Sequence, residues 1–140
     1  MAYRFLDHTA DLGIEVTAVD LPELYVEALR GLTDSLVDLE RVSASVSRDV
    51  GLESPDLETL FVDWLNEVIV WYETEGLVLS DAKIRLDEGD SGWRLIGSVR
   101  GESYDAERHG LKTLIKAVTY HQLSIEHRRE GWRARFILDL

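Results

Sequence analysis

Carboxylates stand near both ends of this sequence, where together they could bind a hard cation. Asp139 follows the apolar run Phe136-Ile137-Leu138, and the sequence stops one residue later, at Leu140. A second group of acids lies in the segment Asp7-His8-Thr9-Ala10-Asp11. Carboxylate oxygens are the ligands that calcium and similar cations prefer. Each acid alone is more typical of a polar turn or a solvated strand end, so a cation site depends on their combination.

Length and composition restrict the kinds of protein that this chain can be. Its 140 residues predict a single domain over residues 1–140, large enough to bury one core. Because there is no cysteine, disulfides and thiolate metal sites are excluded, and any metal must be held by oxygen or imidazole. No long apolar run and no basic leader are present, so we expect a cytoplasmic protein without a membrane span.

The net charge of −12 is unevenly distributed along the chain. Residues 1–100 carry 8 Lys and Arg against 21 Asp and Glu, whereas residues 101–140 carry 7 against 6. An acidic surface repels polyanions, so tight direct binding of nucleic acid is not expected. Docking onto a basic protein suits the charge better, although simple solubility explains most of these acids equally well.

The N-terminal part of the sequence predicts two strands, a helix and a third strand. Strands over residues 3–6 and 13–19 flank a polar turn at residues 7–11. Apolar residues then recur at helical spacing from residue 21 to about residue 39, with Asp20 as the N-cap. Residues 42–49 alternate between apolar or long side chains and polar ones, which indicates a half-buried strand.

The remaining sequence predicts a second helix and two hairpins. Ser54-Pro55-Asp56 resembles a helix start with Ser54 as the cap, and Gly76 ends the helix. Strands over residues 77–86 and 93–99 follow, and a second hairpin joins residues 123–129 to residues 132–138. The order favours an α+β fold: a mostly antiparallel or mixed sheet with two long helices packed on one face.

Residues 111–120 could form either a helix or a strand. Leu111, Leu114, Ile115 and Val118 fit a helix, but the many β-branched residues favour an irregular extended strand. A strand would place Lys116 in an apolar row with Tyr120. Its stem could lie along the sheet while its ammonium reaches water, or the charge could serve a function, and the sequence leaves both open.

An enzyme active site is not evident in this sequence. The four histidines, His8, His109, His121 and His127, form no metalloprotease pair, and no glycine-rich loop with a lysine suggests a phosphate cradle. A serine triad is unsupported as well. Two carboxylates on an exposed edge lack the separated proton affinities and the pocket that acid–base catalysis needs.

Five motifs spread along the chain resemble the archease family. They are Asp7-His8-Thr9-Ala10-Asp11, Asp63-Trp64-Leu65-Asn66-Glu67, Gly101-Glu102 followed by Asp105 and His109, Lys116-Ala117-Val118-Thr119-Tyr120-His121, and Ile137-Leu138-Asp139-Leu140. The resemblance covers essentially the whole chain. It implies a non-enzymatic activator of the GTP-dependent RNA ligase that joins tRNA halves, promoting ligase guanylylation and multiple turnover in tRNA splicing.

The resemblance also implies a metal site. In archeases a divalent cation, assigned as calcium, is held by residues that match Asp11, Asp139 and Leu140, the last through backbone or terminal oxygen. Asp7, His8 and His109 are candidates for the surroundings of this site, although each alone is more typical of a turn or of packing. Lys116 is a candidate contact to the partner. The cation-rich stretch Arg108-His109-Gly110-Leu111-Lys112 could place positive charge beside the carboxylates.

Two other functions remain compatible with the sequence. A chaperone-like binding module would use an exposed apolar patch and tolerate mutation of the acids. A metal-dependent phosphohydrolase would turn over substrate without a partner.

Overall fold

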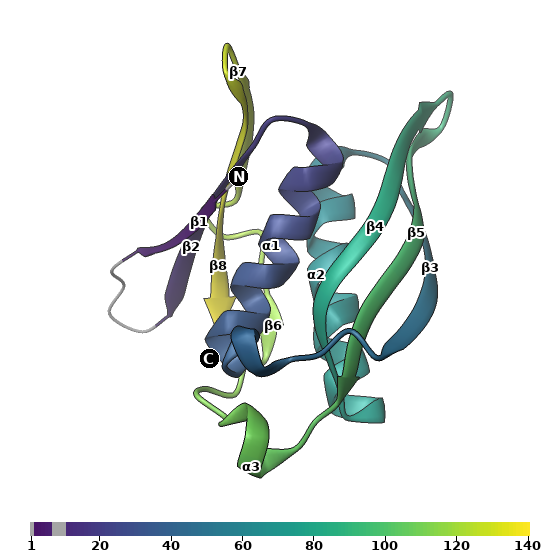
Figure 1. Ribbon diagram of the computed structural model, residues 1–140. Coiled ribbons are helices and arrows are strands. Elements are labelled where there is room, and N and C mark those ends of the chain that lie inside the picture. The colour runs from purple at the N-terminus through teal and green to yellow at the C-terminus, as the bar shows by residue number, and fades with distance from the viewer. Residues whose placement is uncertain (1, 7–10) are drawn as a thin grey trace.

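Two antiparallel sheets enclose a pair of long helices in the computed structural model of this protein, which describes residues 2–6 and 11–140 (Figure 1). The larger sheet has the strand order β1-β2-β8-β6, with β7 also paired to β8, and the smaller has the order β3-β5-β4. The strands of the larger sheet are β1 (Ala2–Leu6), β2 (Leu12–Ala18), β6 (Ala117–Val118), β7 (Ser124–Arg128) and β8 (Gly131–Asp139). Those of the smaller sheet are β3 (Val46–Ser54), β4 (Leu77–Gly89) and β5 (Gly92–Ser103).

The helices α1 (Leu21–Leu36) and α2 (Leu57–Glu75) lie between the two sheets and contact both of them. Their apolar faces supply much of the core, because a helix placed between two sheets can bury more than one stripe of its surface. The largest fully buried side chains come from both helices and both sheets: Trp64, Tyr25, Phe61, Phe136, Ile14, Leu24, Leu29, Leu32, Leu60, Leu65, Leu79 and Leu95.

Buried hydrogen bonds connect the helices to one another and to the smaller sheet. The indole Nε1 of Trp64 donates to the carbonyl of Tyr25 at 2.8 Å, and the Tyr25 hydroxyl donates to the carbonyl of Leu57 at 2.7 Å. The Thr33 hydroxyl donates to the carbonyl of Leu79 at 2.7 Å, at the irregularity in β4. Since buried polar groups are costly without partners, these bonds favour one arrangement of α1, α2 and β4.

The α+β class and the two long helices are confirmed, while the arrangement of the strands differs from the expectation of one sheet. The strands divide into two sheets, one on each side of the helix pair, and every pairing is antiparallel. Gly76 ends α2 in the left-handed conformation, as expected. A short helix, α3 (Ala106–His109), and a 3-10 turn, η1 (Leu39–Arg41), complete the structure.

Three local predictions were wrong, each because a side chain or tertiary contact took over a backbone group. The first helix ends at Leu36, and its next residues lead into η1. The strand predicted for residues 42–49 begins only at Val46 and continues to Ser54, because the N–H of Ser43 binds the carboxylate of Glu102. Asp56, not Ser54, caps α2 by accepting from the N–H of Thr59 at 2.7 Å.

Candidate functional site

The register of the larger sheet brings Asp11 and Asp139 together. Leu12 and Leu138 form the last pair of the antiparallel ladder of β2 and β8, and Asp11 and Asp139 are the next residues beyond that pair, so both adjoin this end of the sheet. Neighbouring strands lie about 4.8 Å apart. Asp139 is exposed and Asp11 is partly exposed. Two carboxylates 128 positions apart in the sequence therefore adjoin one end of the sheet.

Lys116 lies on the other side of Asp139. Ala117 pairs with Asp139 across β6 and β8, and the N–H of Lys116 donates to the Asp139 carbonyl at 2.8 Å. The expectation of an irregular extended segment is confirmed, since only Ala117–Val118 is regular strand within residues 111–120. The apolar row expected around Lys116 does not form. Leu114 is 64% exposed and Tyr120 is 56% exposed, so the lysine stands in a solvent-facing surface.

Asn66 of α2 fixes the position of β6 from the side away from β8. Its side-chain carbonyl accepts from the N–H of Val118 at 2.8 Å, and its amide donates to the carbonyl of the same residue at 3.2 Å. The Asn66 side chain thus gives Val118 the two backbone hydrogen bonds that a neighbouring strand would supply. Asn66 belongs to one of the five sequence motifs, but no role was expected for it because nothing in its local sequence reveals a partner 52 positions away.

The segment from His109 to Lys116 is held at its start by a cluster of buried polar side chains. His109 is fully buried, with its Nδ1 accepting from the N–H of Asp105 at 2.9 Å and its Nε2 lying 3.3 Å from Glu102. Glu102 is also buried and accepts from the side chain of Arg108 and from the N–H of Ser43. Through these contacts His109 holds the start of the segment to α3 and to the end of β5. Its ring therefore has a structural role.

Further hydrogen bonds attach the same segment to the C-terminal end of α1. The carbonyl of His109 accepts from the N–H of Asp38 at 2.9 Å, and the N–H of Lys112 donates to the carbonyl of Leu36 at 2.7 Å. The Lys112 ammonium lies 3.3 Å from Oδ1 of Asp34, and the other carboxylate oxygen, Oδ2, accepts from the Tyr3 hydroxyl. The cation-rich stretch around residue 110 thus holds the chain to α1.

Burial determines the protonation of His109. Desolvation lowers the pKa of its imidazole, the nearby Arg108 guanidinium lowers it further, and Asp105 opposes the shift. The ring of Tyr104 stacks on the imidazole at a centroid distance of 5.9 Å. A neutral imidazole is thus favoured at neutral pH.

The described part of the site offers oxygen donors for a cation. Asp11 and Asp139 supply two carboxylates, and oxygens of Leu140 adjoin them, a donor set that fits a hard cation such as Ca²⁺. Within residues 2–6 and 11–140, no three His, Asp or Glu side chains converge as a metal cluster. Asp7 and His8, which we expected near this site, lie outside the described residues.

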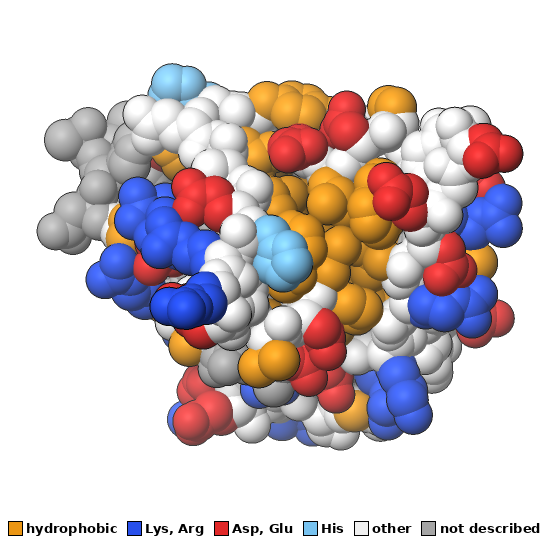
Figure 2. All heavy atoms as spheres, turned by 90° about the horizontal axis from the view of Figure 1, so that it is seen from above, with side chains coloured by type: hydrophobic (Ala, Val, Ile, Leu, Met, Phe, Trp, Pro, Cys, Tyr) orange, Lys and Arg blue, Asp and Glu red, His pale blue; other side chains and the backbone are white. Residues whose placement is uncertain are grey.

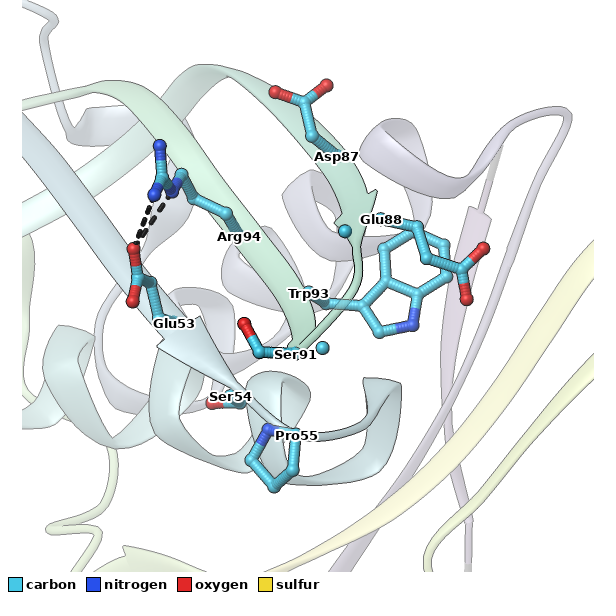
Figure 3. Close-up of a pocket in the computed structure, with 10 residues that line it drawn as sticks. Glu53, Ser54, Pro55, Asp87, Glu88, Ser91, Trp93 and Arg94 are labelled. Carbon is cyan, nitrogen blue, oxygen red and sulfur yellow. Dashed lines mark hydrogen bonds and ion pairs between the residues drawn. The ribbon is translucent and has the colours of Figure 1, made fainter.

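The larger of two described cavities lies in the smaller sheet, between the β4–β5 hairpin tip and the end of β3. Its volume is 520 Å³, and Glu53, Asp87, Glu88, Trp93 and Arg94 are among its lining residues. Figure 3 shows that Glu53 pairs with Arg94 while the carboxylates of Asp87 and Glu88 point apart. Because these acids do not converge on one point, the cavity lacks the paired groups of an acid–base site.

Comparison with known proteins gives one consistent result. The sequence profile of the Archease protein family matches residues 3–140. Protein archease of Methanopyrus kandleri is 36% identical over the whole of both chains, and that of Thermococcus gammatolerans is 38% identical over 99% of this chain and 98% of its own.

Two solved structures are similar as well. The solution structure of Methanobacterium thermoautotrophicum protein 1598 is 33% identical, with a TM-score of 0.83 over 99% of this chain and 98% of that chain. The crystal structure of an archease, described as a possible chaperone, from Thermotoga maritima is 22% identical, with a TM-score of 0.55 over 96% of this chain and 94% of that chain. The second likeness concerns the fold alone.

Replacing Asn66 with Ala is expected to destabilise the protein by about 1–3 kcal/mol, because both backbone groups of Val118 lose their side-chain partner. Urea unfolding measures the change. Glu73→Ala, at an exposed position of the same helix, is the control and should stay within about 0.5 kcal/mol of the unsubstituted protein. Equal stabilities of the two variants would show that β6 does not depend on Asn66.

The burial of His109 predicts a dependence of stability on pH. Because the pKa of His109 is lowered in the folded protein, the unfolded chain binds the proton first as pH falls. The contribution of the neutral imidazole to the free energy of unfolding is therefore fully present above the ordinary pKa of 6.5 and declines below it. The difference in unfolding free energy between the unsubstituted protein and His109→Gln should therefore shrink from pH 7.5 to pH 5.5, about one unit either side of that pKa.

His121→Gln, at an exposed histidine, is the control for that comparison and should stay within about 0.5 kcal/mol of the unsubstituted protein at pH 7.5. Growth of the His109 difference on acidification would mean that an ion pair with Glu102 dominates over burial.

Proposed function

Because this chain belongs to the archease family, we propose that it is a non-enzymatic, metal-binding activator of the GTP-dependent RNA ligase that joins tRNA halves. In this role it would promote guanylylation of the ligase and allow multiple turnover in tRNA splicing. The observation that supports the proposal is that Asp139 pairs beside Lys116 at the end of the β2–β8 ladder that Asp11 also adjoins. The family resemblance assigned Asp11 and Asp139 to the metal site, and Lys116 is the candidate contact to the partner.

The metal in this proposal is a divalent cation, with calcium as the best candidate. Asp11, Asp139 and an oxygen of Leu140 would hold it, and calcium accepts six to eight oxygen ligands, which leaves positions for water or for groups of the partner. When bound, the cation would supply positive charge that an anionic group of the ligase could meet. Asp139 pairs with Ala117 of β6 and its carbonyl accepts from the N–H of Lys116, so its backbone is held in place before any partner arrives.

The location of this site supports binding more than catalysis. The two carboxylates and Lys116 lie at the solvent-facing end of a sheet, and neither described cavity includes any of them. Acid–base chemistry requires groups with separated proton affinities around a substrate that is shielded from water. The imidazole of His109 is committed to its contacts with Glu102 and Asp105.

The surface around Lys116 suits a protein partner. Leu114, Tyr120 and Leu140 are each exposed by more than a third, and exposed apolar side chains beside charged ones are common in protein interfaces. The overall charge of −12 would favour a basic partner surface. A chaperone-like module is the alternative, and the description of the Thermotoga maritima relative as a possible chaperone favours testing it.

None of the helices in the described part of the chain has the length and apolar composition of a membrane span.

Asp11→Asn and Asp139→Asn should each weaken Ca²⁺ binding by at least about tenfold, or about 1.4 kcal/mol, because each removes a ligand charge and keeps the side-chain shape. Calorimetry with Ca²⁺ and Mn²⁺ measures the affinity. Both variants should also lose stimulation of ligase guanylylation while keeping the melting temperature of the unsubstituted protein.

Asp90→Asn, at the exposed tip of the other sheet, is the matched control and should retain metal affinity and stimulation. Unchanged Ca²⁺ affinity in Asp11→Asn and Asp139→Asn would refute the metal site. Nucleotide or RNA hydrolysis by the purified protein alone would instead support the phosphohydrolase, and stimulation that is indifferent to both acids would support the chaperone.

Lys116→Met should keep both the melting temperature and Ca²⁺ affinity yet reduce stimulation of ligase guanylylation. Methionine retains most of the stem and removes the charge, and among the described residues no ion pair of Lys116 is lost. Lys83→Met, at an exposed lysine of β4, is the control and should stimulate normally. Full stimulation by Lys116→Met with a lowered melting temperature would show that the lysine only supports the fold.

A further inference from the structure

One hairpin of each sheet projects beyond the start of the helix pair (Figure 1). The hairpin of β4 and β5 stands on one side, that of β7 and β8 stands on the other, and α1 and α2 begin between them. Seen from this end, the molecule has a hollow lined by hydrophobic side chains, with Asp and Glu side chains around it (Figure 2). We call this hollow the hairpin cleft, defined by partly exposed apolar residues of the hairpins, of β3 and of α2: Leu52, Leu57, Leu86, Trp93, Ile125 and Trp132.

The two tryptophans of the hairpin cleft lie on the inner faces of the two sheets. On β5, Leu95 is fully buried, whereas Trp93, two residues nearer the tip, is partly exposed. On β8, Ala134 is fully buried, whereas Trp132, again two residues nearer the tip, is partly exposed. Residues two apart share one face of a strand. Both tryptophans therefore point inward at the level where the helices no longer cover the sheets.

The gap between the hairpins is one helix layer thick, because α1 and α2 hold the two sheets apart along the rest of their length. A helix with its side chains is about 10–12 Å across. The inner face of a sheet offers side chains and not backbone groups, so an extended segment in the cleft would leave its own N–H and C=O groups without partners. An α-helix satisfies these groups internally. The geometry therefore favours a helix that continues the layer of α1 and α2.

Glu88 stands beside Trp93 at the rim of the hairpin cleft. The two residues are opposite one another in the ladder of β4 and β5, so they share the inner face. Figure 3 shows both side chains pointing away from Glu53 and Arg94, which form an ion pair at 2.7 Å on the outer face. Glu88 is exposed and has no ion pair with Lys or Arg in the part of the chain that the structure describes. Its charge is therefore free for a partner.

The helices add further carboxylates to the rim. Glu23 lies in the first turn of α1 and Glu58 in the first turn of α2. Within residues 2–6 and 11–140, neither forms an ion pair with Lys or Arg. The hairpin cleft thus combines apolar walls with unmatched negative charge, which favours a partner that brings cations.

We propose that the hairpin cleft docks a basic amphipathic α-helix of a protein partner, with its apolar stripe between Trp93 and Trp132 and its Lys or Arg side chains on the carboxylates of the rim. Tryptophans are common anchors at the centre of such interfaces. A second copy of this chain does not match, because α1 carries three acids and α2 five, against one arginine between them. Nucleic acid and anionic membrane surfaces would be repelled by the same carboxylates.

The hairpin cleft is separate from the proposed metal site. Trp132 and Asp139 lie near opposite ends of β8, roughly 23 Å apart at about 3.3 Å per residue. A helix in the cleft and a partner at Asp139 can therefore be bound at the same time. The proposal thus adds a second docking surface to the activator function.

The test is fluorescence anisotropy of a labelled peptide of leucine and lysine, about 18 residues long, whose leucines recur at helical spacing. The variant Glu58→Gln with Glu88→Gln should bind this peptide at least about tenfold more weakly, because two charge contacts are lost. Its affinity should also fall less steeply with salt, since salt screens those contacts. Trp93→Leu should weaken binding and leave the salt dependence unchanged, because it removes apolar contact alone.

The matched control is Glu73→Gln with Glu107→Gln. Both glutamates are exposed, and in the described part of the chain neither has an ion pair with Lys or Arg. They belong to the end of α2 and to α3, at the opposite end of the molecule (Figure 1). The control removes the same charge and should bind the peptide as the unsubstituted protein does. A peptide of the same composition in scrambled order tests the apolar stripe and should bind at least about tenfold more weakly.

Three results of the peptide assay would overturn the proposal: no binding by the unsubstituted protein at about 50 mM salt, equal weakening in the control, or equal binding of the scrambled peptide. So would a dimer in sedimentation that Trp93→Leu dissociates, since a second copy would then occupy the cleft. Should Trp93→Leu melt early, the variant of Glu58 and Glu88 still decides, because both side chains are exposed and contribute little packing.

Discussion

The pairing of β8 with β2 is the constraint on which the arrangement of this protein depends. It joins the beginning of the chain to its end across seven residue pairs, from Leu12 with Leu138 to Ala18 with Trp132. Phe136 and Leu138 of β8 are almost completely buried beneath the helices, and burying such side chains contributes about 1.5–3 kcal/mol each. A shift of one residue would turn both of them toward solvent, so the register is strongly specified. That register also sets Asp139 one residue beyond the Leu12–Leu138 pair, at the end of the sheet that Asp11 adjoins.

The segment leading to Lys116 has no regular structure of its own for most of its length, and its course is set from outside. Its start depends on the buried contacts of His109 and Glu102, its middle on α1, and its end on Asn66 and β8. Each anchor satisfies backbone or side-chain groups that would otherwise be buried without partners. An exposed lysine can thus hold a defined position although its own side chain contributes little packing.

Sequence and structure describe the charge of this protein differently. The sequence is acidic, and the expectation that such a chain avoids nucleic acid follows from its total charge. The sheet, however, takes one arginine from its first strand and three from its last two and places them over the carboxylate of Glu15 and beside that of Glu126. Within a Debye length of about 8 Å, a ligand therefore meets paired charges on that face and unpaired carboxylates at the hairpin cleft.

The sequence by itself determined the α+β class, both long helices with the Asp20 cap and the Gly76 stop, and the last hairpin, because these depend on local periodicity and on turn chemistry. The family resemblance also led to the prediction of Asp11, Asp139 and Leu140 as metal ligands. Only the tertiary structure decided that the strands form two sheets around the helices, that Asn66 holds β6, that His109 is buried, and that the arginines share a face. These features depend on contacts between residues tens of positions apart, and no local pattern carries information on which distant strands will pair.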